Sequence, residues 1–151
     1  MTRFASLAIA ALFAAAAFPV VAQTPQFAKP DDAIKFRQDT LKELQKNFKR
    51  VADMAGGRDP FDAKVAEESA QRAAELIKQP WVAFGPGTEG GKAKPEIWRE
   101  QDKFKDLAGK AEVEVAKLAV AAKTGNLDTI KASLGAAGAS CKACHDSYRN
   151  R

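Results

Sequence analysis

Two cysteines and a histidine stand together near the end of the chain, in the run Cys141-Lys142-Ala143-Cys144-His145, and the sequence has no other histidine and no other cysteine. The form C-x-x-C-H is typical of covalent haem c attachment. Residues three and four apart share one face of a helix, so both thiols can add to the two vinyl groups along one porphyrin edge. The imidazole that follows then lies under the iron, and we predict that it is an axial ligand.

Two other chemistries compete for these three side chains. A zinc site needs four ligands, and the chain adds only carboxylates to the cluster. A thioredoxin-like dithiol requires a βαβ setting, which the sequence does not indicate. A disulfide between cysteines three apart would close a tiny loop and stabilise little. The motif therefore favours haem attachment.

The sixth iron position is constrained by the composition of the chain. Because His145 is the only histidine, ligation by two histidines of one chain is excluded. Methionine, lysine, water or nothing remain. Met54 is the only methionine besides Met1, and it lies near the end of a predicted helix, where we interpret it as a packing residue.

The fold class follows from the periodicity. Apolar residues recur every three or four positions, and no sustained period-two alternation occurs, so we predict an all-α protein. Caps, prolines and glycines place four helices at about residues 30–56, 59–79, 95–124 and 126–148, with an irregular segment over 80–94. Apolar stripes and short first and third connections predict an antiparallel up-down-up-down four-helix bundle.

Arg37 occupies an inward position of the first helix, between Ile34 and Leu41. A buried cation requires a partner, and no carboxylate stands in a stripe of the first or last helix. A haem propionate would pair well with the guanidinium, and Gln38 could add a hydrogen bond. Alternatively, Arg37 lies at the end of the bundle and reaches into solvent.

The first 22 residues have the three parts of a secretory signal peptide. Arg3 precedes an apolar run over residues 4–18, and small residues lead to a cleavage position after Ala22. A membrane anchor is the alternative, but the run is short for a span and no stop-transfer charges follow. We therefore expect a signal peptide over 1–22 and one domain over 23–151.

The charge balance excludes some partners. The chain has 24 basic and 19 acidic residues, so loss of Arg3 leaves 23 − 19 = +4. Two haem propionates would lower this by about two. A balance this small, scattered along the helices, does not indicate nucleic acid, and no other apolar run is long enough to cross a membrane.

Four stretches of the sequence resemble the cytochromes c′, the class II c-type cytochromes. They are QFAKPDDAIKFRQ at 26–38, PWVAFGPGTEGG at 80–91, PEIW at 95–98 and ASCKACHDSYR at 139–149. A C-x-x-C-H close to the C-terminus is itself specific, because class I cytochromes c carry it near the N-terminus. The resemblance covers nearly all of the expected mature domain.

This resemblance implies a high-spin, five-coordinate haem c, a periplasmic location and a homodimer. It implies haem contacts for four side chains: Arg37, Gln38, Thr88 and Glu89. It places Leu41 over the open iron face, where low-spin relatives carry a methionine ligand, and Arg149 beside the proximal face. Met54 is 13 residues from Leu41, roughly 20 Å along a helix, and cannot reach the same iron position.

Three functions remain to be weighed. An open iron beside a leucine, which donates no hydrogen bond, favours nitric oxide and carbon monoxide over dioxygen as ligands. A dedicated one-electron carrier between periplasmic redox proteins is the alternative. A peroxidase is disfavoured, because the chain has no distal histidine to act as acid or base. We therefore expect a gas-binding haem protein that is not an enzyme.

Overall fold

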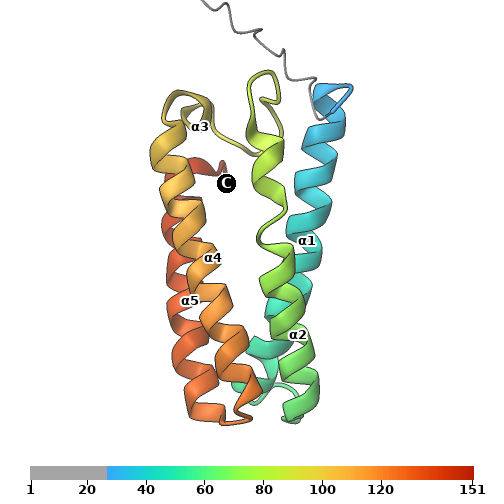
Figure 1. Ribbon diagram of the computed structural model, residues 1–151, viewed down its shortest axis with the longest axis vertical. Coiled ribbons are helices and arrows are strands. Elements are labelled where there is room, and N and C mark those ends of the chain that lie inside the picture. Colours follow the sequence, from blue (N-terminus) through green and yellow to red (C-terminus); the bar gives the residue numbers. More distant parts are fainter. Residues whose placement is uncertain (1–26) are drawn as a thin grey trace, which may run out of the picture.

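The computed structural model describes residues 27–151, so the expected signal peptide lies outside the described residues. The elements are α1 (Pro30–Ala55), α2 (Ala63–Leu76), the 3-10 helix η1 (Pro80–Phe84), α3 (Glu96–Arg99), α4 (Gln101–Lys123) and α5 (Leu127–Tyr148). In Figure 1, α1, α2, α4 and α5 run alternately down and up the long axis. The predicted all-α, up-down-up-down four-helix bundle is therefore confirmed.

The order of packing leaves one side of the bundle less closed. The helix α2 packs against both α1 and α4, and α4 packs against α5, whereas α1 and α5 contact each other more sparsely. The segment between α2 and α4 passes over one end of the bundle, the end at which α1 begins and α5 finishes (Figure 1). No helix within residues 27–151 combines the length and apolar character that crossing a membrane requires.

Local signals set most helix ends as predicted. The helix α1 has Pro30 in its first turn, and it is followed by Gly57 in the left-handed region at φ +71°. The side chain of Asn126 accepts a hydrogen bond from the backbone N–H of Thr129 at 2.9 Å and caps α5. The long first and last helices therefore begin and end where the sequence indicates.

Two boundaries differ from the prediction. The second helix begins at Ala63, because the Asp62 carboxylate accepts the backbone N–H of Val65 at 3.0 Å and forms the cap that we had expected at Asp59. The segment over 80–94 is not wholly irregular, since its first five residues form η1.

The predicted third helix is divided in two at Glu100, whose φ of −121° and ψ of 44° are not helical. The side chain of Gln101 donates to the carbonyls of Phe84 and Ile97, both at 3.1 Å. The Glu100 carboxylate accepts the Tyr148 hydroxyl at 2.9 Å. These hydrogen bonds attach the chain at Glu100 and Gln101 to η1 and to α5. The periodicity of the sequence does not indicate them.

The core consists of two clusters of buried side chains. The larger cluster runs along the bundle and includes Val51, Leu118 and Ile130, each at most 1 % exposed. The smaller, aromatic cluster lies at the end where α5 finishes and contains Phe84, Ile97, Phe104 and Tyr148. The predicted stripe of the third helix is buried throughout: Ile97, Phe104, Ala108, Ala111, Val115, Leu118 and Ala122.

Replacing Ile130 tests the larger cluster. Ile130 is 0 % exposed, so Ile130→Ala removes buried methyl groups and leaves a cavity. We expect the free energy of unfolding to fall by about 2–5 kcal/mol in chemical denaturation. The control is Val120→Ala on α4, at a side chain that is 66 % exposed, with an expected change within about 0.5 kcal/mol. Equal losses in the two variants would contradict this account of the core.

Asp53 is the only buried carboxylate among residues 27–151. It accepts hydrogen bonds from Lys49 and from Arg58, whose Nε lies 2.7 Å from Oδ1. The Lys49 ammonium and the Arg58 guanidinium hold the pKa of the Asp53 carboxyl below its ordinary value. This cluster joins the last turn of α1 to the connection that leads to α2.

The lowered pKa of Asp53 predicts a pH-dependent contribution to stability. It is present above the unfolded pKa, about 4, and is lost as the pH falls through the lower folded pKa. We therefore expect Asp53→Asn to lower the thermal midpoint at pH 7 and to differ less from the parent at pH 3. Thermal unfolding of both proteins at the two pH values checks this, and an equal difference at both would contradict it.

Candidate haem-attachment site

The C-x-x-C-H motif lies in the C-terminal part of α5, at the end of the bundle that the segment after α2 covers (Figure 1). Cys141 and Cys144 are half-buried, and Cys144 packs against the aromatic cluster. His145 is exposed, which leaves its ring accessible. The helix therefore presents the two thiols three residues apart with the imidazole directly after them, as attachment along one porphyrin edge requires.

The two thiols are not activated. Burial raises the pKa of Cys141, and burial together with the neighbouring Cys141 raises the pKa of Cys144 to about 11. Reactive dithiols show the opposite, a lowered pKa. Both cysteines are free, and residues 27–151 contain no group of three histidine, cysteine or acidic side chains able to hold a metal ion. Neither the dithiol nor the zinc interpretation gains support.

The surroundings of His145 favour its neutral form. Partial desolvation of the ring by neighbouring groups and the positive charge of Arg149 lower its pKa, and the negative charge of Asp146 opposes this effect. Neutral imidazole is the form that binds a metal. The backbone N–H of Arg149 donates to the carbonyl of His145 at 3.0 Å, and Arg149 pairs with Ala93 in an isolated antiparallel bridge. The exposed Arg149 side chain thus starts one turn beyond the histidine.

Arg37 is 3 % exposed and is held by backbone carbonyls. Its Nη1 donates to Ala83 at 2.7 Å and to Thr88 at 2.6 Å, and its Nη2 donates to Gly90 at 2.9 Å. The alternative of an arginine that reaches into solvent is therefore wrong. The prediction that a buried Arg37 requires a carboxylate partner did not foresee these bonds. Backbone carbonyls between α2 and α4 accept its N–H groups instead.

The guanidinium nevertheless keeps donors free. It has five N–H groups, of which three are used, so the Nε–H and one Nη2–H remain for another acceptor. Its carbon lies 4.6 Å from the centre of the Phe84 ring and 5.6 Å from that of Trp98. Burial lowers the pKa of Arg37, and the negative charge of Glu89 opposes this effect. A cation with spare donors beside an aromatic cluster fits a propionate.

We call Arg37 and the carbonyls of Ala83, Thr88 and Gly90 the arginine cradle. The remaining residues predicted to contact the haem lie beside it. A Cβ on Gly91, where φ is +63°, would lie 2.9 Å from Nε2 of Gln38, so the exposed Gln38 side chain lies over that glycine. Thr88 donates its hydroxyl proton to the carbonyl three residues earlier at 2.7 Å. Glu89 is exposed. The structure brings Gln38, Thr88 and Glu89 to the arginine, and their haem contacts stay predictions.

Leu41 lies one turn beyond Arg37 on α1 and is half-buried. The next turn carries Leu44, which is buried in the larger cluster together with Ala137 of α5, one turn before Cys141. Leu41 therefore lies on α1 between Arg37 and the larger cluster, and its place at the iron stays a prediction. Met54 is 5 % exposed in the last turn of α1, at the other end of the bundle, and packs as expected.

Trp81 is not among the site residues predicted from the sequence, and its Nε1 is buried without a hydrogen-bond partner among the described residues. Trp81 packs against both clusters, one of which includes Cys144 at its border. An orphaned donor beside the motif fits a group that brings acceptor oxygens to this end of the bundle. The available signal was a tryptophan directly after Pro80, at the start of a glycine-rich segment.

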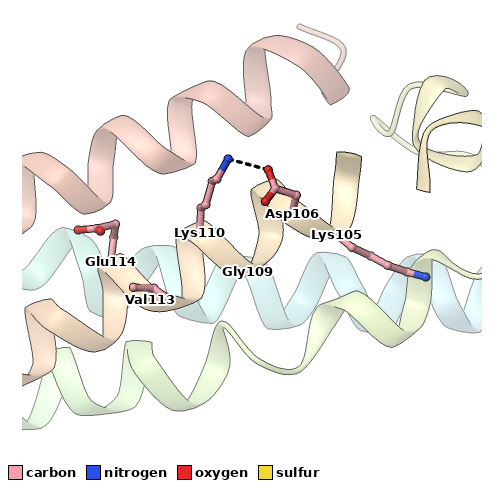
Figure 2. A pocket seen from close by; sticks show the side chains of 6 residues that line it. All are labelled: Lys105, Asp106, Gly109, Lys110, Val113 and Glu114. Carbon is pink, nitrogen blue, oxygen red and sulfur yellow. Dashed lines mark hydrogen bonds and ion pairs between the residues drawn. The ribbon is translucent and has the colours of Figure 1, made fainter. Parts of the chain in front are cut away.

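A groove of about 420 Å³ lies away from these residues (Figure 2). All of its lining residues belong to α4: Lys105, Asp106, Gly109, Lys110, Val113 and Glu114. Its Lys110 and Asp106 pair with each other at 2.6 Å. The groove is open and internally compensated, and it is separate from the predicted site.

Comparison with known proteins agrees with this geometry. The family model described as Cytochrome C' matches residues 32–149. The cytochrome c′ of Alcaligenes xylosoxydans xylosoxydans is 44 % identical over 126 residues, which cover 83 % of this chain and 99 % of the relative. That of Rubrivivax gelatinosus is 46 % identical over 129 residues, with coverage of 83 % and 100 %.

Solved structures show the same fold. A nitric oxide complex of a leucine-to-isoleucine variant of the Alcaligenes xylosoxidans protein matches with a TM-score of 0.80 and 43 % identity, over 83 % of this chain and 100 % of that chain. Proteins of this family carry covalently bound haem c, so the predicted cofactor is confirmed. The chain therefore belongs to the cytochrome c′ family.

Proposed function

We propose that this chain carries one haem c bound through thioethers to Cys141 and Cys144, with His145 as the axial ligand, and that it binds nitric oxide or carbon monoxide at the iron. The observation that supports the proposal is that Phe84 contacts the Arg37 guanidinium and belongs to the aromatic cluster against which Cys144 packs. The solved nitric oxide complex of a family member adds support.

Different residues of the chain are proposed to border the open iron position and to bind the propionates. The haem supplies a five-coordinate, high-spin iron with one open position for a diatomic gas. Leu41 borders that position without offering a hydrogen bond, so it selects against dioxygen and restricts access by its volume. Arg37 and Gln38 hold a propionate, Thr88 and Glu89 border it, and these contacts fix the macrocycle against the segment.

Single-electron transfer is the second candidate function. Lys142 and Ala143, which lie between the two cysteines, are exposed, and this supports a haem edge close to the surface and accessible to a redox partner. In this alternative the chain is a dedicated electron carrier, and gas binding is incidental. Fast electron self-exchange that nitric oxide does not change would favour it.

The setting proposed for this function is the periplasm, as a homodimer in contact with periplasmic redox proteins. The signal-peptide pattern over residues 1–22 supports export, and attachment of the haem then follows it. We propose a binder and not an enzyme, because the side chain assigned to the open iron face, Leu41, cannot transfer a proton. Neither nucleic acid nor a membrane is proposed as a partner.

The ferrous absorption spectrum with and without nitric oxide tests the proposed function. For protein matured with haem in a periplasm, we expect a broad, unsplit visible band that changes when the gas is added, because the iron is open. A sharp low-spin α band that ignores the gas would contradict the proposal. Mass spectrometry provides the control: the parent gains the mass of one haem, and the variant with both Cys141→Ser and Cys144→Ser does not.

Enlarging the space at Leu41 tests its role as a steric gate. We expect Leu41→Ala to raise the association rate of carbon monoxide by about tenfold, equivalent to removing about 1.4 kcal/mol from the barrier. Flash photolysis of the ferrous protein measures this rate. The matched control is Leu127→Ala, a half-buried leucine in the first turn of α5 at the opposite end, with an expected unchanged rate. An equal rate in Leu41→Ala and the parent would contradict the gate.

A further inference from the structure

Trp81 holds the only buried side-chain nitrogen or oxygen within residues 27–151 that has no hydrogen-bond partner. A buried N–H without an acceptor loses its hydration and gains nothing in return, so folded proteins rarely keep one without a reason. The other tryptophan behaves differently, since Nε1 of Trp98 donates to the carbonyl of Gly85 at 2.8 Å. The missing acceptor is therefore specific to Trp81 and is not shared by the other tryptophan at this end of the bundle.

The place of Trp81 connects the arginine cradle with the attachment helix. Its ring stacks on Phe84 with centroids 6.3 Å apart and meets Phe104 edge-on at 5.9 Å. The Arg37 guanidinium also contacts Phe84, with its carbon 4.6 Å from the ring centre. Cys144 packs against the cluster that contains both phenylalanines. The indole thus lies in the same aromatic cluster as the spare donors of the arginine and the second attachment thiol.

We propose that Trp81 positions the haem by donating its Nε1–H to a propionate carboxylate. This inference rests on the proposed haem site. The two propionates are the strong hydrogen-bond acceptors of a haem, and an N–H···carboxylate bond is stronger than a neutral one. Arg37, which also contacts Phe84 and has a positive charge and two unused N–H groups, attracts an anion to the same region. The Nε1–H of Trp81, which has no acceptor in the polypeptide, would then have a propionate oxygen as its acceptor in the holoprotein.

A hydrogen bond from Trp81 has a measurable consequence for the reduction potential. A donor stabilises the ionised propionate and lowers its pKa. The ionised propionate favours the ferric haem, so the potential falls as the pH rises through that pKa. Removal of the donor raises the propionate pKa and moves the fall in potential to higher pH.

The test is the pH profile of the reduction potential of the holoprotein with Trp81→Phe, which keeps an aromatic ring and removes the N–H. We expect the fall in potential to move to higher pH by about one unit. A shift of this size corresponds to the free energy of one hydrogen bond to a charged group. Asn47→Ala is the control, since it removes a side-chain N–H bonded to a backbone carbonyl at 2.9 Å, ten residues along α1 from Arg37, and should leave the pH of the fall in potential unchanged. Arg37, Glu89 and Tyr148, ionisable groups around the cluster, stay unchanged in both variants.

An independent readout is the ultraviolet resonance Raman spectrum of the indoles. The difference between parent and Trp81→Phe holoprotein should show a strongly hydrogen-bonded indole N–H. A difference spectrum of a free N–H, a fall in potential that stays at the same pH, or an equal shift in Asn47→Ala would each overturn the inference. Failure of the parent to take up covalent haem would instead overturn the proposed function, so the two failures are distinguishable.

Discussion

The buried guanidinium of Arg37 is the interaction on which the haem end of this protein depends. It draws three carbonyls of the segment after α2 onto α1, at 2.6 to 2.9 Å. Separating these groups would leave a desolvated cation and carbonyls without donors, so the segment has one strongly preferred position. Thr88 and Glu89 owe their place to this anchor, because they lie between two of the carbonyls that it holds.

The other end of the same segment is fixed to α5. Lys94 donates to the carbonyls of Asp146 and Ser147 at 3.1 and 3.2 Å, which are free acceptors at the C-terminus of that helix. The backbone N–H of Lys94 also donates to the carbonyl of Tyr148 at 3.0 Å. Since α1 and α5 contact each other sparsely, the segment adds a second connection between these two helices at the haem end.

The sequence predicted what depends on local chemistry and on periodicity. The motif, the helix carrying it and the long first helix need only spacing and caps, and the stripe from Ile97 to Ala122 was buried as expected. The division at Glu100 and the carbonyl cradle were not predictable, because both arise from partners about 50 residues away. The unpaired Nε1–H of Trp81 was also not predictable, since the absence of a hydrogen-bond acceptor leaves no pattern in a sequence.

The separation of these partners along the chain bears on the order in which the protein assembles. The bonds that close the haem end join residues 46 to 53 positions apart, whereas the helices themselves need only contacts four residues apart. Bringing together residues this far apart costs loop-closure entropy, which contacts within one helix turn do not. Each helix can therefore form before the segment is in place, whereas the geometry of the haem end depends on chain closure over about 50 residues.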